Sequence, residues 1–343
     1  SGLHLHFKAL KNDKEALAVI NDYIIAAVTN SPYIAQYDAT APPKEGLKAS
    51  NLLEIPKTKF PNEFIVPKDK ISNMLFNGQL SEKLQPLRME RRGSRKELTA
   101  KASINFDELK EVQLSNKHIT PYDREVHDAV VSLYIDGKNE YVTPLMIYRT
   151  MTGNPNGKLT EKILNDISEA IERCSRTRVY IDATGEVEGK GYDIQQPIYK
   201  ENLLYTRSIK GLHNGKMGEW IQIIQPPILY RYANSKNQVA RMDMKLLNTP
   251  VNKNEETIVL QGYLQRRILT MKGSNLSKNI LYETIYKQLN IEATSPGALR
   301  KKQSKVRDTI KNILDFWKDE NFIEDYKENT GARNSKISVS IIL

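Results

Sequence analysis

The sequence predicts an α+β fold, because a helical pair followed by a β-hairpin occurs twice along its 343 residues. In the C-terminal copy, apolar residues recur at helical spacing over residues 279–289 and over residues 295–320. Residues 322–342 then form two short runs, the second alternating, on either side of a turn rich in Gly and Asn, which is typical of a hairpin. Helix, turn, basic helix and hairpin is the element order of a winged helix. We therefore expect two tandem winged helices, preceded by an N-terminal region of unassigned fold.

The composition favours a folded protein with an acidic partner. Lysine and arginine number 51 against 41 acidic residues, and 39% of the residues are hydrophobic. Ribosomal or membrane-surface association would fit the charge alone. Cys174 is the only cysteine, so it forms no internal disulfide and no multi-cysteine zinc site. No apolar run approaches the roughly 20 residues of a membrane helix. We expect a cytoplasmic, nucleoid-associated protein without a cofactor or metal.

The N-terminal region, residues 1–85, has no fold or role that the sequence assigns. It holds one helix at residues 13–28 and five prolines between residues 41 and 70, with a short strand at residues 64–66. His4 and His6 form the His-apolar-His pattern with which rolling-circle nickases hold a metal ion beside a nucleophilic tyrosine. No preceding strand is present to build the central sheet of such a site. An edge strand or a frayed terminus is therefore favoured.

Residues 86–103 are interpreted as a basic linker. Cations crowd this stretch, and three of them are candidate secondary DNA contacts: Arg91, Arg92 and Arg95. Such an arm can follow phosphates or enter a minor groove. A solvated tether explains the same residues, and we favour it slightly.

Residues 104–254 predict the first winged helix. Thr120-Pro121 and Thr143-Pro144 are typical helix starts, and Thr160 precedes a third amphipathic helix. Strands are expected at residues 177–182, 203–209 and 219–224, which implies a long insertion between the strands of this module. The turn at residues 153–160 resembles a phosphate-binding loop. Only three residues separate its glycines, however, and Leu159 follows its lysine, so ATP binding is rejected.

The third helix of this first copy has an exposed face of mixed charge. Its members are Glu161, Lys162, Asn165, Ser168, Glu169 and Glu172. Such a mixture repels phosphate as much as it attracts it. Lys158, Lys162 and Asn165 stay candidate secondary DNA contacts, whereas dimerisation or positioning on the DNA backbone is the favoured role of this copy.

Residues 255–343 predict the second winged helix and the main DNA-binding domain. Its first helix covers residues 255–272, and Ser295-Pro296 begins the basic helix. An apolar face anchors that helix in a core, while its other side carries cations where a winged helix meets the major groove. A charged run can also be a merely solvated surface. The residues expected at DNA are Arg300, Lys301, Ser304, Lys305, Arg307 and Lys311, with Arg333 and Lys336 near the hairpin tip.

Residues 104–343 resemble the iteron-binding replication initiators of plasmids. The resemblance rests on the two successive winged helices, the second one basic, and on three stretches: residues 122–126 (Tyr-Asp-Arg-Glu-Val), 258–269 and 298–315. It implies a non-catalytic protein that initiates DNA replication at origin repeats. The second winged helix would read the major groove of a repeat. The first would help the chain dimerise, and a host helicase or its loader is a possible partner.

Two other functions stay open at this stage. A transcriptional regulator or partition factor could use the same scaffold, although no effector-binding domain is evident. A metal-dependent nickase using His4, His6 and a tyrosine is the alternative from another class. The sequence also leaves open whether the replicon is a plasmid, a phage or an integrative element.

Overall fold

The fold is α+β, as predicted, and all of its described strand pairings are antiparallel. The computed structural model describes residues 58–80, 82–83, 85–89, 98–106, 118–187, 198–213, 216–272, 277–331 and 335–343. All of them belong to one unit, residues 55–343. The helix expected at residues 13–28 and the residues His4 and His6 lie outside the described residues.

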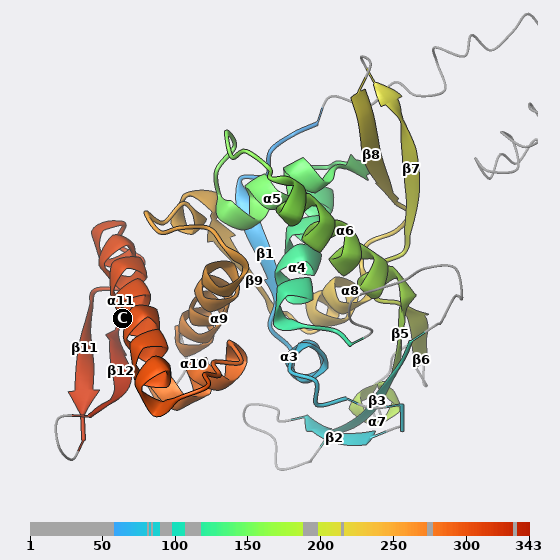
Figure 1. Ribbon diagram of the computed structural model, residues 1–343. Helices are drawn as coiled ribbons and strands as arrows, with labels where there is room; N and C mark the ends of the chain where they lie inside the picture. Colours follow the sequence, from blue (N-terminus) through green and yellow to red (C-terminus); the bar gives the residue numbers. More distant parts are fainter. Residues whose placement is uncertain are drawn as a thin grey trace, which may run out of the picture. The chain divides into compact units, whose positions relative to one another are not determined.

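The first module, residues 58–254, is built around three helices and a hairpin (Figure 1). Its elements are α4 (Pro121–Ile135), β4 (Tyr141–Val142), α5 (Pro144–Thr152), α6 (Glu161–Arg176), β7 (Thr206–His213) and β8 (Lys216–Ile223). The three strands form one sheet in the order β4-β8-β7. The hydroxyls of Thr120, Thr143 and Thr160 cap the helices as expected, and Pro121 and Pro144 occupy first-turn positions.

The second module, residues 255–343, repeats this order of elements. They are α9 (Glu255–Met271), β10 (Asn279–Leu281), α10 (Tyr282–Gln288), α11 (Pro296–Asp319), β11 (Asp325–Thr330) and β12 (Lys336–Ile342). The sheet order is β10-β12-β11, which matches β4-β8-β7. The helix expected to begin at residue 279 instead begins at Tyr282. The three residues before it form a strand, because Ile280 pairs with Val339 and is buried there.

The basic linker expected at residues 86–103 is wrong, because both of its ends are strands. β2 (Gln85–Met89) and β3 (Leu98–Phe106) pair with each other. They continue through β5 (Thr177–Asp182) to β6 (Ile198–Asn202) in a four-stranded sheet, and the short helix α7 (Thr184–Val187) follows β5. Ala100 and Ala102 of β3 are buried. Because these inward residues are small alanines between cations, the sequence lacks the alternating pattern of large apolar residues that predicts a strand.

This sheet also corrects the expected insertion in the first module. Residues 177–182 do form a strand, but β5 pairs with β3 and β6 and not with the hairpin. The insertion therefore lies between α6 and β7, ahead of the hairpin rather than between its two strands.

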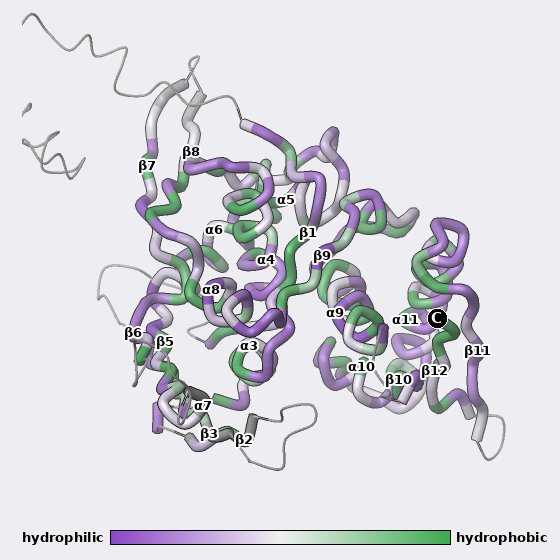
Figure 2. The backbone as a smooth tube through the Cα atoms, turned by 180° about the vertical axis from the view of Figure 1, so that it is seen from behind, coloured by the Kyte–Doolittle hydropathy of each residue, from purple (hydrophilic) through white to green (hydrophobic). Residues whose placement is uncertain are grey.

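The boundary expected at residue 85 is also wrong, because residues 58–80 are part of the first module. β1 (Glu63–Pro67) pairs with β9 (Val239–Asp243), and α3 (Lys70–Phe76) begins just after it. Figure 2 shows β1 as a hydrophobic strand. Residues 226–254 also contain the helix α8 (Ile228–Ser235) and the 3-10 turn η3 (Met244–Leu247).

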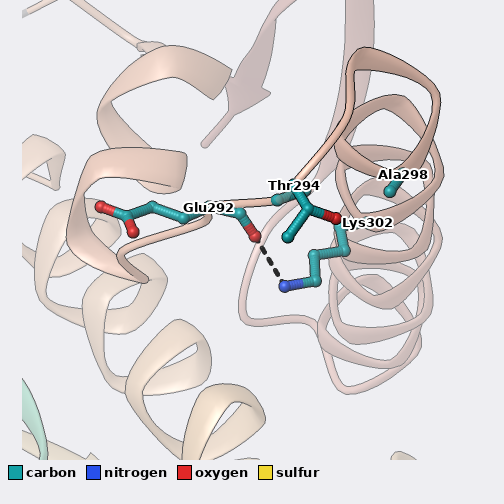
Figure 3. A pocket seen from close by; sticks show the side chains of 5 residues that line it. Glu292, Thr294, Ala298 and Lys302 are labelled. Carbon is teal, nitrogen blue, oxygen red and sulfur yellow. Dashed lines mark hydrogen bonds between the residues drawn. The ribbon is translucent and has the colours of Figure 1, made fainter.

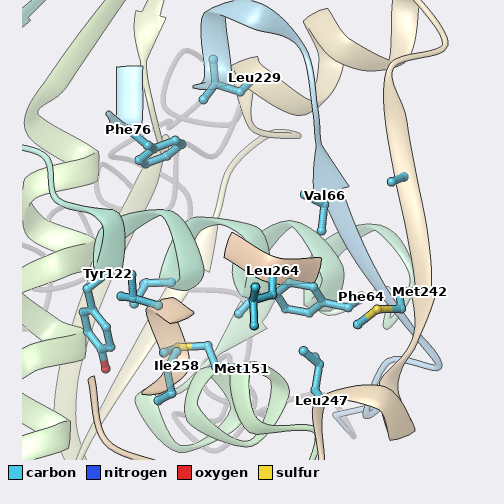
Figure 4. Close-up of a cluster of buried hydrophobic side chains, with 14 of the residues drawn as sticks. Phe64, Val66, Phe76, Tyr122, Met151, Leu229, Met242, Leu247, Ile258 and Leu264 are labelled. Carbon is cyan, nitrogen blue, oxygen red and sulfur yellow. The ribbon is translucent and has the colours of Figure 1, made fainter. Parts of the chain in front are cut away.

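One hydrophobic core runs through both modules. Figure 4 shows Ile258 and Leu264 of α9 in one cluster with Phe64, Met242 and Leu247 of the first module. All five side chains are buried. Because α9 of the second module contributes to the same core as β1 and β9 of the first module, the two modules pack directly on each other.

Candidate nucleic-acid interface

The basic helix α11 is anchored at one end only. Its buried residues are Val306, Ile310, Ile313, Leu314 and Trp317, which follow helical spacing. None of residues 296–305 is buried. At 1.5 Å per residue, about 15 Å of helix therefore extends beyond the core. The Ser295 hydroxyl accepts a hydrogen bond from the Ala298 amide at 3.3 Å and so caps this projecting end.

The C-terminal half of α11 is held tightly. Trp317 is fully buried, and its Nε1 donates to the Leu246 carbonyl at 2.8 Å. Its ring meets Phe322 edge-on with 5.4 Å between centroids. Lys245 and Glu320 add an ion pair of 3.1 Å between η3 and the end of the helix. The contacts of the C-terminal half thus fix the position of the projecting turns of α11.

The projecting turns present cations to solvent. Arg300, Lys301 and Lys305 are exposed, and within the described residues their side chains form no hydrogen bond or ion pair. Ser304 is exposed between them. These groups match the expected set and are available to an anionic ligand.

Lys302 points elsewhere. Its Nζ donates to the Glu292 carbonyl at 2.6 Å, across a shallow pocket lined by Glu292, Ala293, Thr294, Ala298 and Lys302 (Figure 3). This contact ties the turn before α11 to its second helical turn. Lys302 therefore stabilises the projecting end from within.

Arg307 and Lys336, two of the residues expected at DNA, have partners inside the second module. Arg307 is half-buried, and its Nη1 donates to the Tyr286 hydroxyl at 2.9 Å. Lys336 pairs with Glu328 at 2.8 Å. Arg307 follows the buried Val306 directly, so its side chain lies against α10 rather than pointing to solvent. Their roles at DNA stay predictions.

These contacts form a polar chain from the basic helix to the hairpin. Tyr286 stacks on Tyr282 with 6.2 Å between ring centroids, and the Tyr282 hydroxyl donates to Glu328 Oε1 at 2.6 Å. Burial tends to raise the pKa of Glu328, but its hydrogen bonds from Lys336 and Tyr282 outweigh burial and lower it. Glu328 therefore stays ionised and fixes the hairpin against α10.

The hairpin follows α11 from its anchored end. The Tyr326 hydroxyl donates to Asp315 at 2.6 Å, and Lys318 pairs with Asp325 at 2.9 Å. From these contacts β11 runs beside α11 toward the level of its projecting turns (Figure 1). Arg333, expected at the hairpin tip, lies outside the described residues, as do Arg91, Arg92 and Arg95.

The third helix of the first module is electrostatically different. Lys158, Lys162 and Asn165 are exposed, as expected. Glu169 pairs with Arg173 at 3.2 Å, and Glu172 pairs with Arg176. Burial and the nearby Asp166 raise the pKa of Glu255 at the start of α9, while Lys162 opposes that rise. The charge of Lys162 thus acts on a nearby carboxylate as well as on any phosphate.

The resemblance of residues 153–160 to a phosphate-binding loop is explained by a helix end. Gly153 has a φ of 64° and caps α5 in the left-handed conformation. Arg149 Nε donates to the Gly157 carbonyl at 3.1 Å and holds the turn closed. The glycines thus serve the turn between α5 and α6.

The sequence reasoning missed a buried polar cluster on α4. Five ionisable residues of this helix are no more than 4% exposed: Asp123, Arg124, Glu125, His127 and Asp128. Burial of charge is costly unless each group is paired, and each of the five contacts a polar partner on a named element. In the sequence, this cluster is visible only as neighbouring acidic and basic residues beside the apolar positions of the helix.

The α4 cluster connects three other parts of the fold. Arg173 of α6 binds both carboxylate oxygens of Asp123, at 2.8 and 3.0 Å. Arg124 donates to the Pro67 carbonyl and to Asn73 Oδ1, both at 2.9 Å. Glu125 receives a hydrogen bond from Arg266 of α9 at 2.6 Å. The last contact joins the two modules.

Burial raises the pKa of Glu125 to about 7, although Arg266 opposes the rise. His127 is fully buried in the same cluster, and its Nδ1 lies 3.0 Å from Asp128 Oδ1. Cys174 is buried too, and burial raises the pKa of its thiol. Neither side chain is placed for metal binding, and within the described part of the chain no three metal-ligating side chains gather.

No helix among the described residues is both long and apolar enough to span a bilayer.

No protein-family model matches the chain, and no curated protein matches it. Among solved structures, a crystal structure of domains 2-3 of RctB is similar with a TM-score of 0.44 and 11% identity, over 80% of this chain and 96% of that one. A structure of selenomethionine derivatives of RctB domains 2 and 3 gives a TM-score of 0.39 at 11% identity, over 80% and 95%. Similarity at this level assigns no function.

Proposed function

We propose that the second module is a winged helix that binds duplex DNA with the projecting turns of α11 in the major groove. The observation that carries the proposal is the position of Arg300, Lys301 and Lys305. They are exposed on a helix end that leaves the core, and they have no hydrogen-bond or ion-pair partner within the described residues. The helix, strand, helix, helix, hairpin order of the module supports it.

The proposed contacts differ along the helix. Arg300 and Lys301, near the start of α11, would contact base edges, and an arginine can bind the O6 and N7 atoms of guanine with two hydrogen bonds. Lys305 and Lys311, farther along, would contact phosphates. Arg307 would act mainly through Tyr286, by holding α10 against the helix.

The first module would have a supporting role. It shares the element order and the sheet order of the second module, but α6 carries several acidic residues, of which Glu169 and Glu172 pair with neighbouring arginines, and the charge of Lys162 acts on Glu255. We propose that this module helps the chain dimerise and positions it on the DNA backbone. Sedimentation of the free chain should show dimer at high micromolar concentration, and a strict monomer there would contradict this role.

The biological role we propose is initiation of DNA replication at origin repeats, without catalysis by the chain itself. It rests on the resemblance of residues 104–343 to plasmid initiators. A footprint on the origin of the element that encodes the chain should show protected repeats. Protection confined to a promoter, with replication unaffected by loss of the chain, would favour a transcriptional regulator instead.

Two experiments test the mechanism. Arg300→Ala should weaken repeat binding by roughly 1–3 kcal/mol and relax the preference for one base pair. Uniform weakening over all single-base variants would show a phosphate contact instead.

A nicking assay on supercoiled plasmid with divalent metal tests the absence of catalysis, because cleavage that His4→Ala abolishes would make the chain a nickase.

A further inference from the structure

The outward face of the sheet formed by β3, β5 and β6 carries a second set of exposed cations and polar side chains. Alternation along β5 buries Val179 and Ile181, and the residues between them point away from the core. The same alternation in β3 buries Ala100 and Ala102. The residues on the outward face are Lys101, Ser103, Asn105, Arg178, Tyr180, Asp182, Ile198, Lys200 and Asn202, and Ile198 is also exposed.

This face is basic. Lys101, Arg178 and Lys200 are exposed, whereas the acid among these outward residues is Asp182. Hydrogen bonds from Thr184 lower the pKa of Asp182, with a smaller effect from Lys101. The Asp182 carboxylate is therefore partly occupied by Thr184, and Arg178 and Lys200 are left without an acidic partner among the described residues.

Tyr180 lies in the middle of the face. Its neighbours across the strands are Ser103 on one side and Lys200 on the other. Strand spacing near 4.8 Å and a rise near 3.3 Å per residue place the Cα atoms of Arg178 and Lys200 roughly 8 Å apart, and those of Lys101 and Arg178 roughly 14 Å apart. Cations thus lie around a half-buried aromatic ring on the outward face of the sheet.

The outward face of the second-module sheet, on which Lys327 is exposed opposite Ser340, differs in its short polar side chains. There, Asn329 Nδ2 donates to the hydroxyls of Ser338 and Ser340 at 2.9 and 2.7 Å, and Ser340 donates to Asn279 Oδ1 at 2.5 Å. Its polar side chains thus bind one another. By contrast, the side chains of Ser103 and Tyr180 have no hydrogen-bond partner within the described residues. Exposure on a sheet face alone therefore does not explain why these polar side chains lack partners among the described residues.

We propose that this face binds single-stranded nucleic acid, with Tyr180 stacking on a base and Lys101, Arg178 and Lys200 contacting phosphates. Aromatic rings on a basic surface bind single strands because each base has a face to stack on, whereas paired bases are inaccessible to such a ring. The inference is independent of the duplex site on α11, since the two surfaces belong to different modules and share no residue.

The test is a fluorescence anisotropy titration of the full chain with labelled oligothymidine at low salt. Tyr180→Ala should weaken binding at least about fivefold, and Tyr180→Phe should leave it within about twofold of the parent. The triple change Lys101→Ala, Arg178→Ala, Lys200→Ala should weaken binding at least about tenfold and reduce its salt dependence. Lys59→Ala, which removes another exposed cation, should have no effect. Circular dichroism and thermal melting verify that each variant is folded.

Three results would overturn the inference. The parent chain could show no binding to oligothymidine. Tyr180→Ala could bind as well as the parent, even if the triple change weakens binding. Alternatively, Arg300→Ala, Lys301→Ala, Lys305→Ala could abolish oligothymidine binding while the sheet variants retain it, which would assign single strands to α11. A matched duplex titration separates the two sites, because the sheet variants should bind duplex like the parent whether or not α11 reads an origin repeat.

Discussion

Gly262 of α9 packs so closely against Glu125 of α4 that a side chain at this position has no space. Gly262→Ala should therefore destabilise the fold. A Cβ atom at this position would lie far inside the van der Waals distance of the Glu125 carboxylate. In an open helix the same change stabilises by about 1 kcal/mol. Here Glu125 would have to leave Arg266, which is only 9% exposed, and breaking a buried ion pair costs about 3–5 kcal/mol.

The difference predicts a net loss of about 2–4 kcal/mol, or about 3–7 °C in Tm for a unit of this size. Urea unfolding at pH 8, above the raised pKa of Glu125, followed by circular dichroism measures it, because the ion pair with Arg266 is charged there. Gly297→Ala is the matched control, because a Cβ at that helical position meets nothing within 4 Å. The control should be neutral or slightly stabilising. If Gly262→Ala were as stable as Gly297→Ala, the close packing of α4 on α9 would be refuted.

Three further predictions concern the core and the base of α11. The pKa of Glu125 is raised by burial to about 7 from an ordinary value of 4.5, so its contribution to stability is present in full below pH 4.5 and is lost as the pH rises through 7. Glu125→Gln, which faces the same Arg266, Arg124 and Asp128, should therefore flatten the pH dependence of unfolding between pH 5 and 8 by about 1–3 kcal/mol; an unchanged slope would contradict a neutral Glu125. Trp317→Phe should cost about 1–3 kcal/mol in urea unfolding, because the Leu246 carbonyl loses the nearer of its two donors and keeps only Gln261 Nε2 at 3.3 Å; no loss would mean that this hydrogen bond does not anchor α11. Ser295→Ala should lower stability by about 1 kcal/mol through loss of the helix cap, and a denaturation midpoint equal to that of the parent would exclude a capping role.

The sequence identified the elements that have strong local signals. Thr120, Thr143, Thr160 and Ser295 each precede a helix, and each accepts the capping hydrogen bond that its position predicts. The apolar stripe of α11 is buried as expected, because residues spaced at three and four face one side of a helix. Local chemistry determines such features, so a single sequence is enough to find them.

The pairings between distant segments could not be predicted in the same way. β3 pairs with β5 some seventy residues away in the chain, and β1 pairs with β9 at an even larger separation. Neither register follows from local propensity. In β3 the cation Lys101 stands between two buried alanines, so the stretch looked like a basic linker.

The cations of α11 were predicted from helical spacing, but their availability was not. Spacing places Arg300 and Arg307 seven residues apart on similar sides of the helix. Only packing shows that Arg300 is exposed whereas Arg307 donates to Tyr286. The ion pairs of α4 were missed for a similar reason, since Arg173 and Arg266 approach Asp123 and Glu125 from helices far along the chain.

The salt dependence of duplex binding tests the proposed role of α11 most directly. The triple variant Arg300→Ala, Lys301→Ala, Lys305→Ala is titrated with origin duplex at several salt concentrations, beside the first-module control Lys158→Ala, Lys162→Ala. Each lost phosphate contact should reduce the slope of log affinity against log salt by roughly 0.9. We predict a lower slope and a large loss of affinity for the triple variant, with little change in the control. Equal losses in both variants, or a triple variant with the affinity and slope of the parent, would contradict recognition by the projecting turns of α11.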